Sequence, residues 1–132
     1  MIVADTSALI AILLQESAGE ECLRILTTAD VAISAASLVE TGIVIEARRG
    51  LQAGRELDRL LQALDATVID VDEAQAAVAR HAYRTYGKGR HPAGLNFGDC
   101  FSYALAMTHA APLLFVGDDF SQTDVEPVTG TR

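Results

Sequence analysis

Residues 1–10 read MIVADTSALI, which is a short apolar run, an aspartate, two hydroxyl residues and a second apolar run. An unalternating apolar strand that passes directly into a helix is typical of a parallel sheet covered by helices on both faces. Asp5 stands at the joint between the two predicted elements. Asp5, Thr6 or Ser7 can simply cap the following helix, or the aspartate can take part in chemistry. The stretch alone does not decide between the two.

Short apolar strands and helical stretches alternate along the rest of the chain, with no linker or repeat between them. This predicts one α/β domain over residues 1–132, with a central parallel sheet of four to five strands and right-handed crossovers. The glycine-rich span 86–94 is predicted to be a loop. The predicted strands are 2–4, 31–34, 67–71, 113–116 and, more weakly, 125–129; the predicted helices are 7–15, 17–29, 36–49, 53–64, 73–86 and 98–109.

The composition bounds the class of protein. A chain of 132 residues, half of them hydrophobic, can bury one continuous core and is not a disordered segment. Cys22 and Cys100 are too few for a disulfide framework and lack metal-ligand spacing, which indicates reduced thiols in a cytoplasmic protein. The apolar run 8–14 is too short to cross a bilayer and follows an aspartate, so we expect neither a membrane span nor a signal peptide.

The charge is unevenly distributed. A net charge of −8 argues against sequence-independent binding of nucleic acid through a basic surface. Arg48 and Arg49 nevertheless form a small basic spot. A larger basic segment contains Arg80, His81, Arg84, Lys88, Arg90 and His91. Such a run is most often a solvated helix face.

Acidic residues recur where a predicted strand meets a predicted helix. They are Asp5, Glu40 and Asp99, followed by the pair Asp118 and Asp119 after the last main strand. Glu40 and Asp99 are each expected in the first turn of a helix. Ser37 and Asn96 stand three residues before them, which is capping-box spacing, so each acid taken singly can be explained as part of a helix cap.

Taken together, the acids predict a metal site. Strand ends and helix starts of a parallel sheet meet at its carboxyl edge, where such folds form a ligand crevice. Carboxylates brought together there repel each other unless a cation compensates, and no lysine or arginine is expected at these joints. Mg²⁺ or Mn²⁺ prefers such oxygen ligands and activates water against a phosphodiester. With the basic segment binding RNA phosphates through Arg80, Arg84, Lys88, Arg90 and His91, the pattern indicates a metal-dependent nuclease.

These residues also resemble a known family. The motifs IVADTSAL (2–9), SLVE (37–40), LNFGDCF (95–101) and LFVGDDF (114–120) occur in the order and spacing of a PIN domain, and specifically of a VapC-type toxin of a bacterial toxin–antitoxin pair. The resemblance covers almost the whole chain. It implies a three-layer α/β/α fold and a Mg²⁺-dependent endoribonuclease that cuts structured RNA, such as transfer or ribosomal RNA. It also implies a cognate antitoxin and a homodimer.

By matching position, the resemblance makes Asp5 and Asp99 the principal metal ligands. Glu40 completes the acidic set directly or through water, and Asp118 fills the fourth position. Ser7 matches the hydroxyl residue that orders the first acid, and Asn96 lies beside the third.

The sequence departs from the family at one point. Many relatives have threonine or serine before the fourth acid, whereas this chain has Gly117. Strand alternation favours Asp118 as the inward-facing acid, but Asp119 remains an alternative, and Asp119 or Asp124 can instead order the loop.

Two other classes of protein remain open. A phosphatase or other hydrolase would use Asp5 as its nucleophile, but that chemistry usually needs a second acid two residues later, where this chain has Ser7. A non-catalytic RNA-binding module would keep the acidic pocket only for structure.

Overall fold

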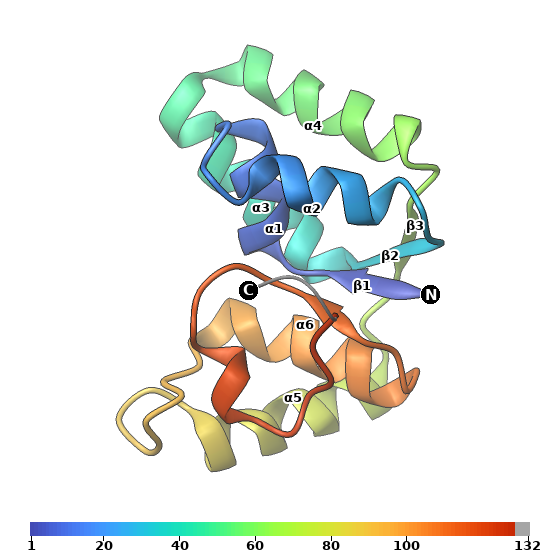
Figure 1. The fold of residues 1–132 in the computed structure, drawn as a ribbon. Coiled ribbons are helices and arrows are strands. Elements are labelled where there is room, and N and C mark those ends of the chain that lie inside the picture. Colours follow the sequence, from blue (N-terminus) through green and yellow to red (C-terminus); the bar gives the residue numbers. More distant parts are fainter. Residues whose placement is uncertain (129–132) are drawn as a thin grey trace.

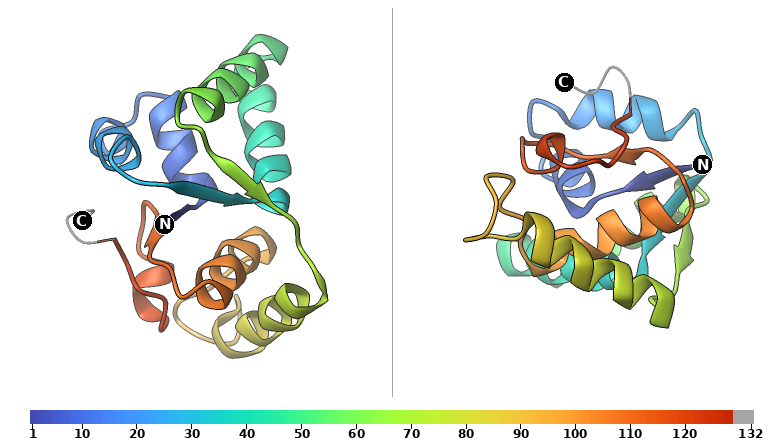
Figure 2. Two further views of the ribbon diagram at one scale, coloured as in Figure 1. Left: turned by 90° about the vertical axis from the view of Figure 1, so that its right-hand side faces the viewer. Right: turned by 90° about the horizontal axis from the view of Figure 1, so that it is seen from below.

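The computed structural model describes residues 1–128 as three layers, in which helices cover both faces of a central sheet (Figure 1, Figure 2). All strand pairings are parallel, in the order β3-β2-β1-β4. The three-layer α/β/α prediction is therefore confirmed. The strands are β1 (Ile2–Ala4), β2 (Val31–Ser34), β3 (Thr67–Ile69) and β4 (Leu113–Leu114); the helices are α1 (Thr6–Leu13), α2 (Gly19–Leu26), α3 (Ala35–Arg49), α4 (Leu51–Ala63), α5 (Glu73–Tyr86) and α6 (Phe97–Thr108).

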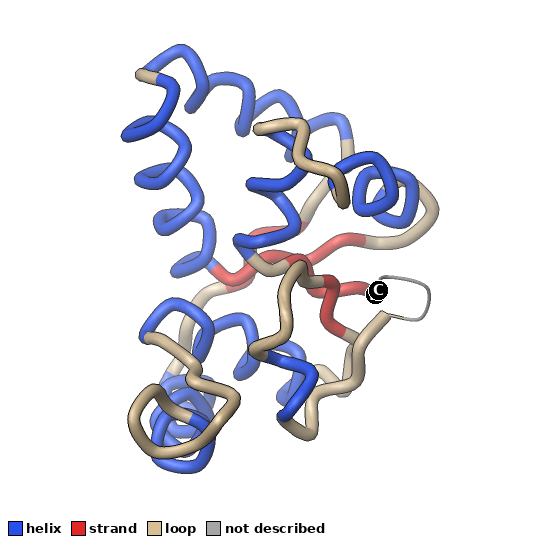
Figure 3. Tube along the Cα trace, turned by 60° about the vertical axis from the view of Figure 1, so that its left-hand side comes forward, coloured by secondary structure: helices blue, strands red, loops and turns tan. Residues whose placement is uncertain are grey.

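Each face of the sheet has its own buried core, because the short strands are apolar on both faces. On one face, Val3 and Leu113 pack with Leu105 of α6 and with residues of α5. On the other face, Ile33 and Leu114 pack with residues of α1 and α2. Figure 3 shows the strands between these two groups of helices.

The chain order creates a switch point beside β1. From β1 the chain adds β2 and then β3 on one side, and it returns at the end to place β4 on the other side. Ligands of open parallel sheets bind in the crevice outside the carboxyl ends of the strands at such a point. Asp5 directly follows β1, so it lies at this crevice.

Most predicted elements are confirmed, with small changes at their ends. The side chain of Asp72 caps α5, and Gly50 ends α3 with a φ of +85°, as the helix stop requires. The predicted loop after α5 is held at its base, where Lys88 N donates to the Leu95 carbonyl at 2.9 Å.

The two later strands are shorter than predicted. β3 ends at Ile69 rather than at residue 71, and β4 ends at Leu114 rather than at residue 116. Val116 N donates to the Ser7 hydroxyl at 2.9 Å instead of to a strand. The weak fifth strand is reduced to an isolated bridge between Leu113 and Pro127, in which Leu113 N donates to the Glu126 carbonyl at 2.8 Å and Val128 N donates to the Leu113 carbonyl at 3.1 Å. Residue 129 of that prediction lies outside the described residues.

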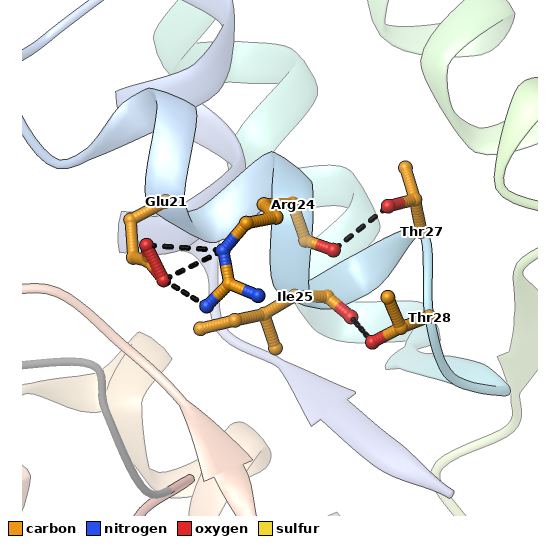
Figure 4. A network of polar contacts seen from close by, with 5 residues as sticks. All are labelled: Glu21, Arg24, Ile25, Thr27 and Thr28. Atoms are coloured by element: carbon orange, nitrogen blue, oxygen red, sulfur yellow. Dashed lines mark hydrogen bonds and ion pairs between the residues drawn. The ribbon is translucent and has the colours of Figure 1, made fainter.

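On its solvent side, helix α2 has local contacts between its own side chains and carbonyls (Figure 4). Arg24 forms an ion pair with Glu21 one turn earlier. The hydroxyls of Thr27 and Thr28 each donate, at 2.7 Å, to carbonyls three residues before them and so satisfy acceptors at the end of the helix. Within residues 1–128, no helix has both the length and the hydropathy needed to cross a bilayer.

Candidate functional site

A cleft of about 330 Å³ opens at the carboxyl ends of β1 and β4. Three of the predicted acids line it: Asp5 from the end of β1, Glu40 from α3, and Asp99 from the start of α6. Segments far apart in the sequence therefore supply one site. The lining residues are Asp5, Thr6, Ser7, Ile10, Glu16, Glu40, Val44, Arg48, Asn96, Asp99 and Val116.

Asp5 caps α1 with only one of its two carboxylate oxygens. Oδ2 accepts from the backbone N–H of Ser7 at 3.0 Å and from the Ser7 hydroxyl at 2.6 Å. Oδ1 is buried and has no hydrogen-bond partner. The aspartate itself is only 3% exposed. A buried anionic oxygen without a partner costs free energy, and a cation bound in the cleft would offset this cost.

Asp99 is arranged in the same way at the start of α6. Its Oδ2 accepts from Asn96 N at 3.0 Å, while Asn96 Oδ1 accepts from Asp99 N at 2.9 Å, which is the predicted capping box. Oδ1 makes no hydrogen bond within residues 1–128. Capping and site chemistry are therefore compatible, because each aspartate uses one oxygen for the cap and leaves the other for the cleft.

Glu40 is held differently from the prediction. The helix α3 begins at Ala35 and is capped by the Ser34 hydroxyl, so Glu40 lies beyond the first turn. The predicted capping box with Ser37 is wrong, because the Ser37 hydroxyl is buried and lies 3.1 Å from the Ser102 hydroxyl of α6.

The Glu40 carboxylate is positioned by the start of α1 and the start of α6. Its Oε1 accepts from the Thr6 hydroxyl at 2.8 Å, and Thr6 in turn accepts from the Thr41 hydroxyl at 3.0 Å. Its other oxygen lies against Gly98, where an added Cβ would overlap the carboxylate. Thr6 and Gly98 thus fix the acid between two elements.

Burial and neighbouring negative charge raise the pKa values of two of the acids, Asp99 and Glu40. Burial is the main cause that raises the pKa of Asp99 to about 7, with the negative charges of Asp5, Asp119 and Glu40 adding to it. The pKa of Glu40 is raised by burial and by Asp5, against the lowering effect of its hydrogen bond from Thr6. Both burial and neighbouring negative charge disfavour an ionised carboxylate, and a cation bound beside it would favour the ionised form.

The donor set fits a hard divalent ion. Asp5 and Asp99 offer oxygen atoms from neighbouring elements, and Asp5 Oδ1 lacks any other partner. Within residues 1–128, no group of three or more His, Cys, Asp or Glu side chains is already arranged to hold one ion. Mg²⁺ is commonly bound by one or two carboxylates together with several waters, so a closed cage of protein ligands is not required.

The candidates for the fourth acid lie on an exposed loop after β4. Neither Asp118 nor Asp119 lines the cleft. Asp119 is close enough to contribute to the raised pKa of Asp99, whereas Asp118 is not among the charges that do so. Gly117 has a φ of +105°, which a threonine or serine would rarely adopt, so the glycine suits the backbone that this chain has here.

Asp124 orders this C-terminal segment. The Tyr103 hydroxyl donates to Asp124 Oδ1 at 2.6 Å and ties the segment to α6.

None of the five predicted RNA-binding residues lines the cleft. Arg80 and Arg84 are exposed on α5, and Lys88 and Arg90 are exposed in the following loop. His91 is half-buried: its Nδ1 accepts from Ala93 N at 3.0 Å, and its ring packs edge-on against Tyr86. These contacts hold the His91 ring in place within the loop.

Three polar residues of the cleft, Thr6, Glu16 and Arg48, are not among the residues predicted for the site. Thr6 was visible only as a possible cap. Arg48 could have been predicted from helical spacing, since it follows Glu40 by eight residues on one predicted helix and lies near the same face. Glu16 follows α1 in a connection with no motif, and nothing in the sequence placed it at the cleft.

The comparisons with known proteins agree with this fold. A model of the PIN domain family matches residues 2–126. The chain is 52% identical over 128 residues to Ribonuclease VapC of Mycolicibacterium smegmatis, which covers 96% of this chain and 99% of the relative. It is 50% identical to Ribonuclease VapC30 of Mycobacterium tuberculosis, with 96% and 98% covered. The chain therefore belongs to the PIN domain family, and within it to the VapC ribonucleases.

Solved structures share the fold at low sequence identity. The crystal structure of Mycobacterium tuberculosis VapC20, described as a sarcin–ricin loop cleaving toxin, matches with a TM-score of 0.80 and 18% identity over 97% of this chain and 98% of that one. A toxin–antitoxin complex from Klebsiella pneumoniae matches with a TM-score of 0.70 and 18% identity over 94% and 93%.

Proposed function

We propose that this chain is the toxin of a toxin–antitoxin pair and acts as a Mg²⁺-dependent endoribonuclease on structured RNA, such as transfer or ribosomal RNA. One observation carries the proposal: Asp5 and Asp99 each commit one oxygen to a helix cap and keep the other free at the same cleft. The names of the VapC relatives support the same activity.

The acids of the cleft have distinct roles in the proposed metal site. Asp5 and Asp99 would be the principal residues that hold the metal. Glu40 would complete the acidic set directly or through water, and Asp118 or Asp119 would fill the fourth position. Bound Mg²⁺, or Mn²⁺, lowers the pKa of a water molecule and stabilises charge on a phosphoryl oxygen.

The hydroxyl and amide residues beside the acids fix their orientation. Ser7 restrains the Asp5 carboxylate, Asn96 restrains Asp99, and Thr6 restrains Glu40. Rigid placement of charged groups where the transition state needs them is the main contribution that such a site can make.

Outside the cleft, the basic surface at the end of α5 and in the loop that follows binds the flanking RNA. This loop leads into Asn96, so RNA held there would pass close to Asp99. The surface comprises Arg80, Arg84, Lys88, Arg90 and His91.

The test is cleavage of transfer and ribosomal RNA by the purified protein with Mg²⁺, with Mn²⁺ and with EDTA. We expect cleavage that requires metal and falls at least about 10³-fold in Asp5→Asn and in Asp99→Asn, because each change removes a metal ligand. Asp58→Asn, an exposed carboxylate on α4, is the control and should cleave normally. Metal-independent cleavage, or full activity of both site variants, would refute the proposal.

The alternatives predict other outcomes of the same assay. Turnover of a small phosphate ester with intact RNA would favour a phosphatase. This chemistry would require Asp5 as nucleophile, although one of its oxygens is held by Ser7 and the other is buried. No hydrolysis by folded, metal-bound protein would favour a passive RNA-binding module.

For the homodimer, we propose an apolar surface beside the cleft as the interface. Phe97, Ile43 and Val39 are 78%, 65% and 61% exposed on α6 and α3. Phe97 stands between two apolar hollows, one toward α5 and one toward α3. A twofold arrangement would place Phe97 of each copy in a hollow of the other, which suits a self-complementary interface.

Sedimentation of Ile43→Asp tests this interface. We expect a monomer for the variant and a dimer for the unaltered chain. A dimer that survives the substitution would place the interface elsewhere.

The cognate antitoxin and a cytoplasmic location also remain proposals. The toxin–antitoxin complexes among the structural neighbours support the antitoxin. Co-expression with the product of an adjacent short gene tests it, since a true antitoxin should copurify and suppress the cleavage of RNA.

A further inference from the structure

We infer that Arg48 binds a phosphate of the RNA strand next to the phosphodiester that is cut, an inference that rests on the proposed nuclease function. Arg48 lies near the end of α3 and lines the same cleft as the acids. It is the only lysine or arginine among the cleft-lining residues of the described chain.

The register of α3 brings Arg48 to the cleft. Glu40, Val44 and Arg48 follow one another at four-residue spacing, and all three line the cleft. Residues four apart lie on one face of a helix. Eight residues correspond to about 12 Å along the axis, so Arg48 is too far from Glu40 to share its ligand but lies along the path of a bound strand. This separation points to a neighbouring phosphate.

The guanidinium of Arg48 is available for a ligand. The only ion pair within residues 1–128 joins Arg24 and Glu21, so Arg48 pairs with none of the carboxylates that share its cleft. Its side chain is exposed and makes no hydrogen bond in the described part of the chain. An unpaired arginine presents a planar fork of donors that matches a phosphate oxygen pair.

The negative charge around the cleft makes a cationic residue there useful for binding RNA. The chain has a net charge of −8, and Asp5, Glu16, Glu40 and Asp99 all face the cleft. This field repels an RNA strand even after a divalent ion has offset part of it. The predicted basic surface does not reach the cleft, so Arg48 is the residue that can offset the repulsion where the strand enters.

Arg49 provides a matched control. It is the next residue on the same helix, it is equally exposed, and it carries the same charge. Arg49 lies in a different hollow, with Leu13, Ile45 and Ala53, and it does not line the acidic cleft. A contact specific to Arg48 should therefore be absent in Arg49.

The experiment measures steady-state cleavage of a labelled fragment of the transfer or ribosomal RNA that the unaltered protein cuts. We expect Arg48→Ala to raise KM roughly tenfold with kcat changed less than about threefold. The slope of log KM against the logarithm of salt concentration should fall by about one. Arg48→Lys should lie between, since it keeps the charge but not the fork. Arg49→Ala should leave both constants within about twofold.

Binding of the same RNA to the Asp99→Asn protein, with and without Arg48→Ala, provides a readout independent of cleavage. We expect the same roughly tenfold loss of affinity there.

Each other outcome overturns the inference. Equal effects of Arg48→Ala and Arg49→Ala would indicate general charge at the end of α3. A fall in kcat at constant KM would place Arg48 at the scissile phosphate. If the unaltered protein cleaves RNA and Arg48→Ala behaves identically, this inference alone fails. If the unaltered protein cleaves no RNA, the proposed function fails and takes this inference with it.

Discussion

Two helix starts carry acidic residues in opposite states. At the start of α2, Glu21 is exposed and pairs with Arg24, and this hydrogen bond lowers the pKa of the glutamate (Figure 4). At the start of α6, Asp99 is partly buried among other acids, and its pKa rises to about 7. The same functional group at equivalent positions therefore differs in whether the chain supplies the compensating charge.

The difference separates an acid that stabilises a helix end from acids that are gathered without a compensating charge. An acid that only stabilises a helix can be satisfied by a neighbouring arginine and the helix dipole, as at α2. The cleft instead gathers Asp5, Glu40 and Asp99 at a cost in repulsion and leaves Asp5 Oδ1 without a partner. Groups held in this way are preorganised for a ligand that brings positive charge.

The largest effect in this comparison of acids is expected when one cleft acid is displaced but not replaced. In Gly98→Ala, the new Cβ would overlap the Glu40 carboxylate and force it out of position. We expect cleavage to fall by about 10²-fold, because a displacement of about 1 Å in a catalytic arrangement has this effect. The assay is RNA cleavage with Mg²⁺, together with thermal unfolding to confirm the fold.

Gly42→Ala is the control for Gly98→Ala. A Cβ at position 42 of α3 meets nothing within 4 Å. This variant should cleave normally and gain about 0.4–1 kcal/mol in the free energy of unfolding. Full activity of Gly98→Ala would mean that the position of Glu40 is not critical.

A smaller effect distinguishes the two candidates for the fourth acid. Asp119 adds to the raised pKa of Asp99, and Asp118 is not among the causes, so we expect Asp119→Asn to reduce cleavage about tenfold and Asp118→Asn to change it less than about threefold. Both side chains are exposed, which makes each variant the control for the other. A larger loss of cleavage in Asp118→Asn than in Asp119→Asn would instead assign the fourth position to Asp118, as strand alternation favours.

Much of this site could be predicted because it follows from chain order. Asp5 and Asp99 stand at joints between elements, and a parallel sheet brings such joints to one edge whatever the details of packing. The capping box of Asn96 was predicted for the same reason, since it depends on spacing within a few residues.

What could not be predicted depends on contacts between distant segments. Ser37 has capping-box spacing to Glu40, but Ser102 of α6 provides a buried partner for its hydroxyl, and Ser34 caps the helix instead. Just beyond the end of β4, Val116 N donates to the hydroxyl of Ser7, more than a hundred residues away in the sequence. Local patterns do not contain such information, because the competing partner lies elsewhere in the chain.

The raised pKa of Asp99 makes stability depend on pH. Its pKa is about 7 in the folded protein against an ordinary value of 3.8, so between these values the folded state binds a proton that the unfolded state lacks. Stability without metal should therefore fall as pH rises from about 4 to about 7 and then level off. Asp99→Asn should flatten this fall and melt several degrees higher than the unaltered chain at pH 8.

Thermal unfolding from pH 4.5 to 8.5 measures this effect. Added Mg²⁺ should raise the Tm of the unaltered chain at pH 8 and have little effect on Asp99→Asn, because binding to the folded state alone stabilises it. Asp58→Asn is the control and should keep the slope. An identical slope in Asp99→Asn would assign the dependence to other groups.

The smallest effect is expected at α2, and it sharpens the contrast with the cleft. Glu21→Gln removes the ion pair with Arg24, but both side chains are exposed and solvent screens their attraction. We expect Tm to change by less than about 1 °C and cleavage to stay the same. Glu20→Gln is the matched variant, because Glu20 shares the first turn of α2 but not the ion pair, so the difference between the two isolates the pair. The difference in Tm between the two variants should vanish at high salt. A large loss of Tm in Glu21→Gln at any salt concentration would show that exposed and buried acids in this protein matter equally to its stability.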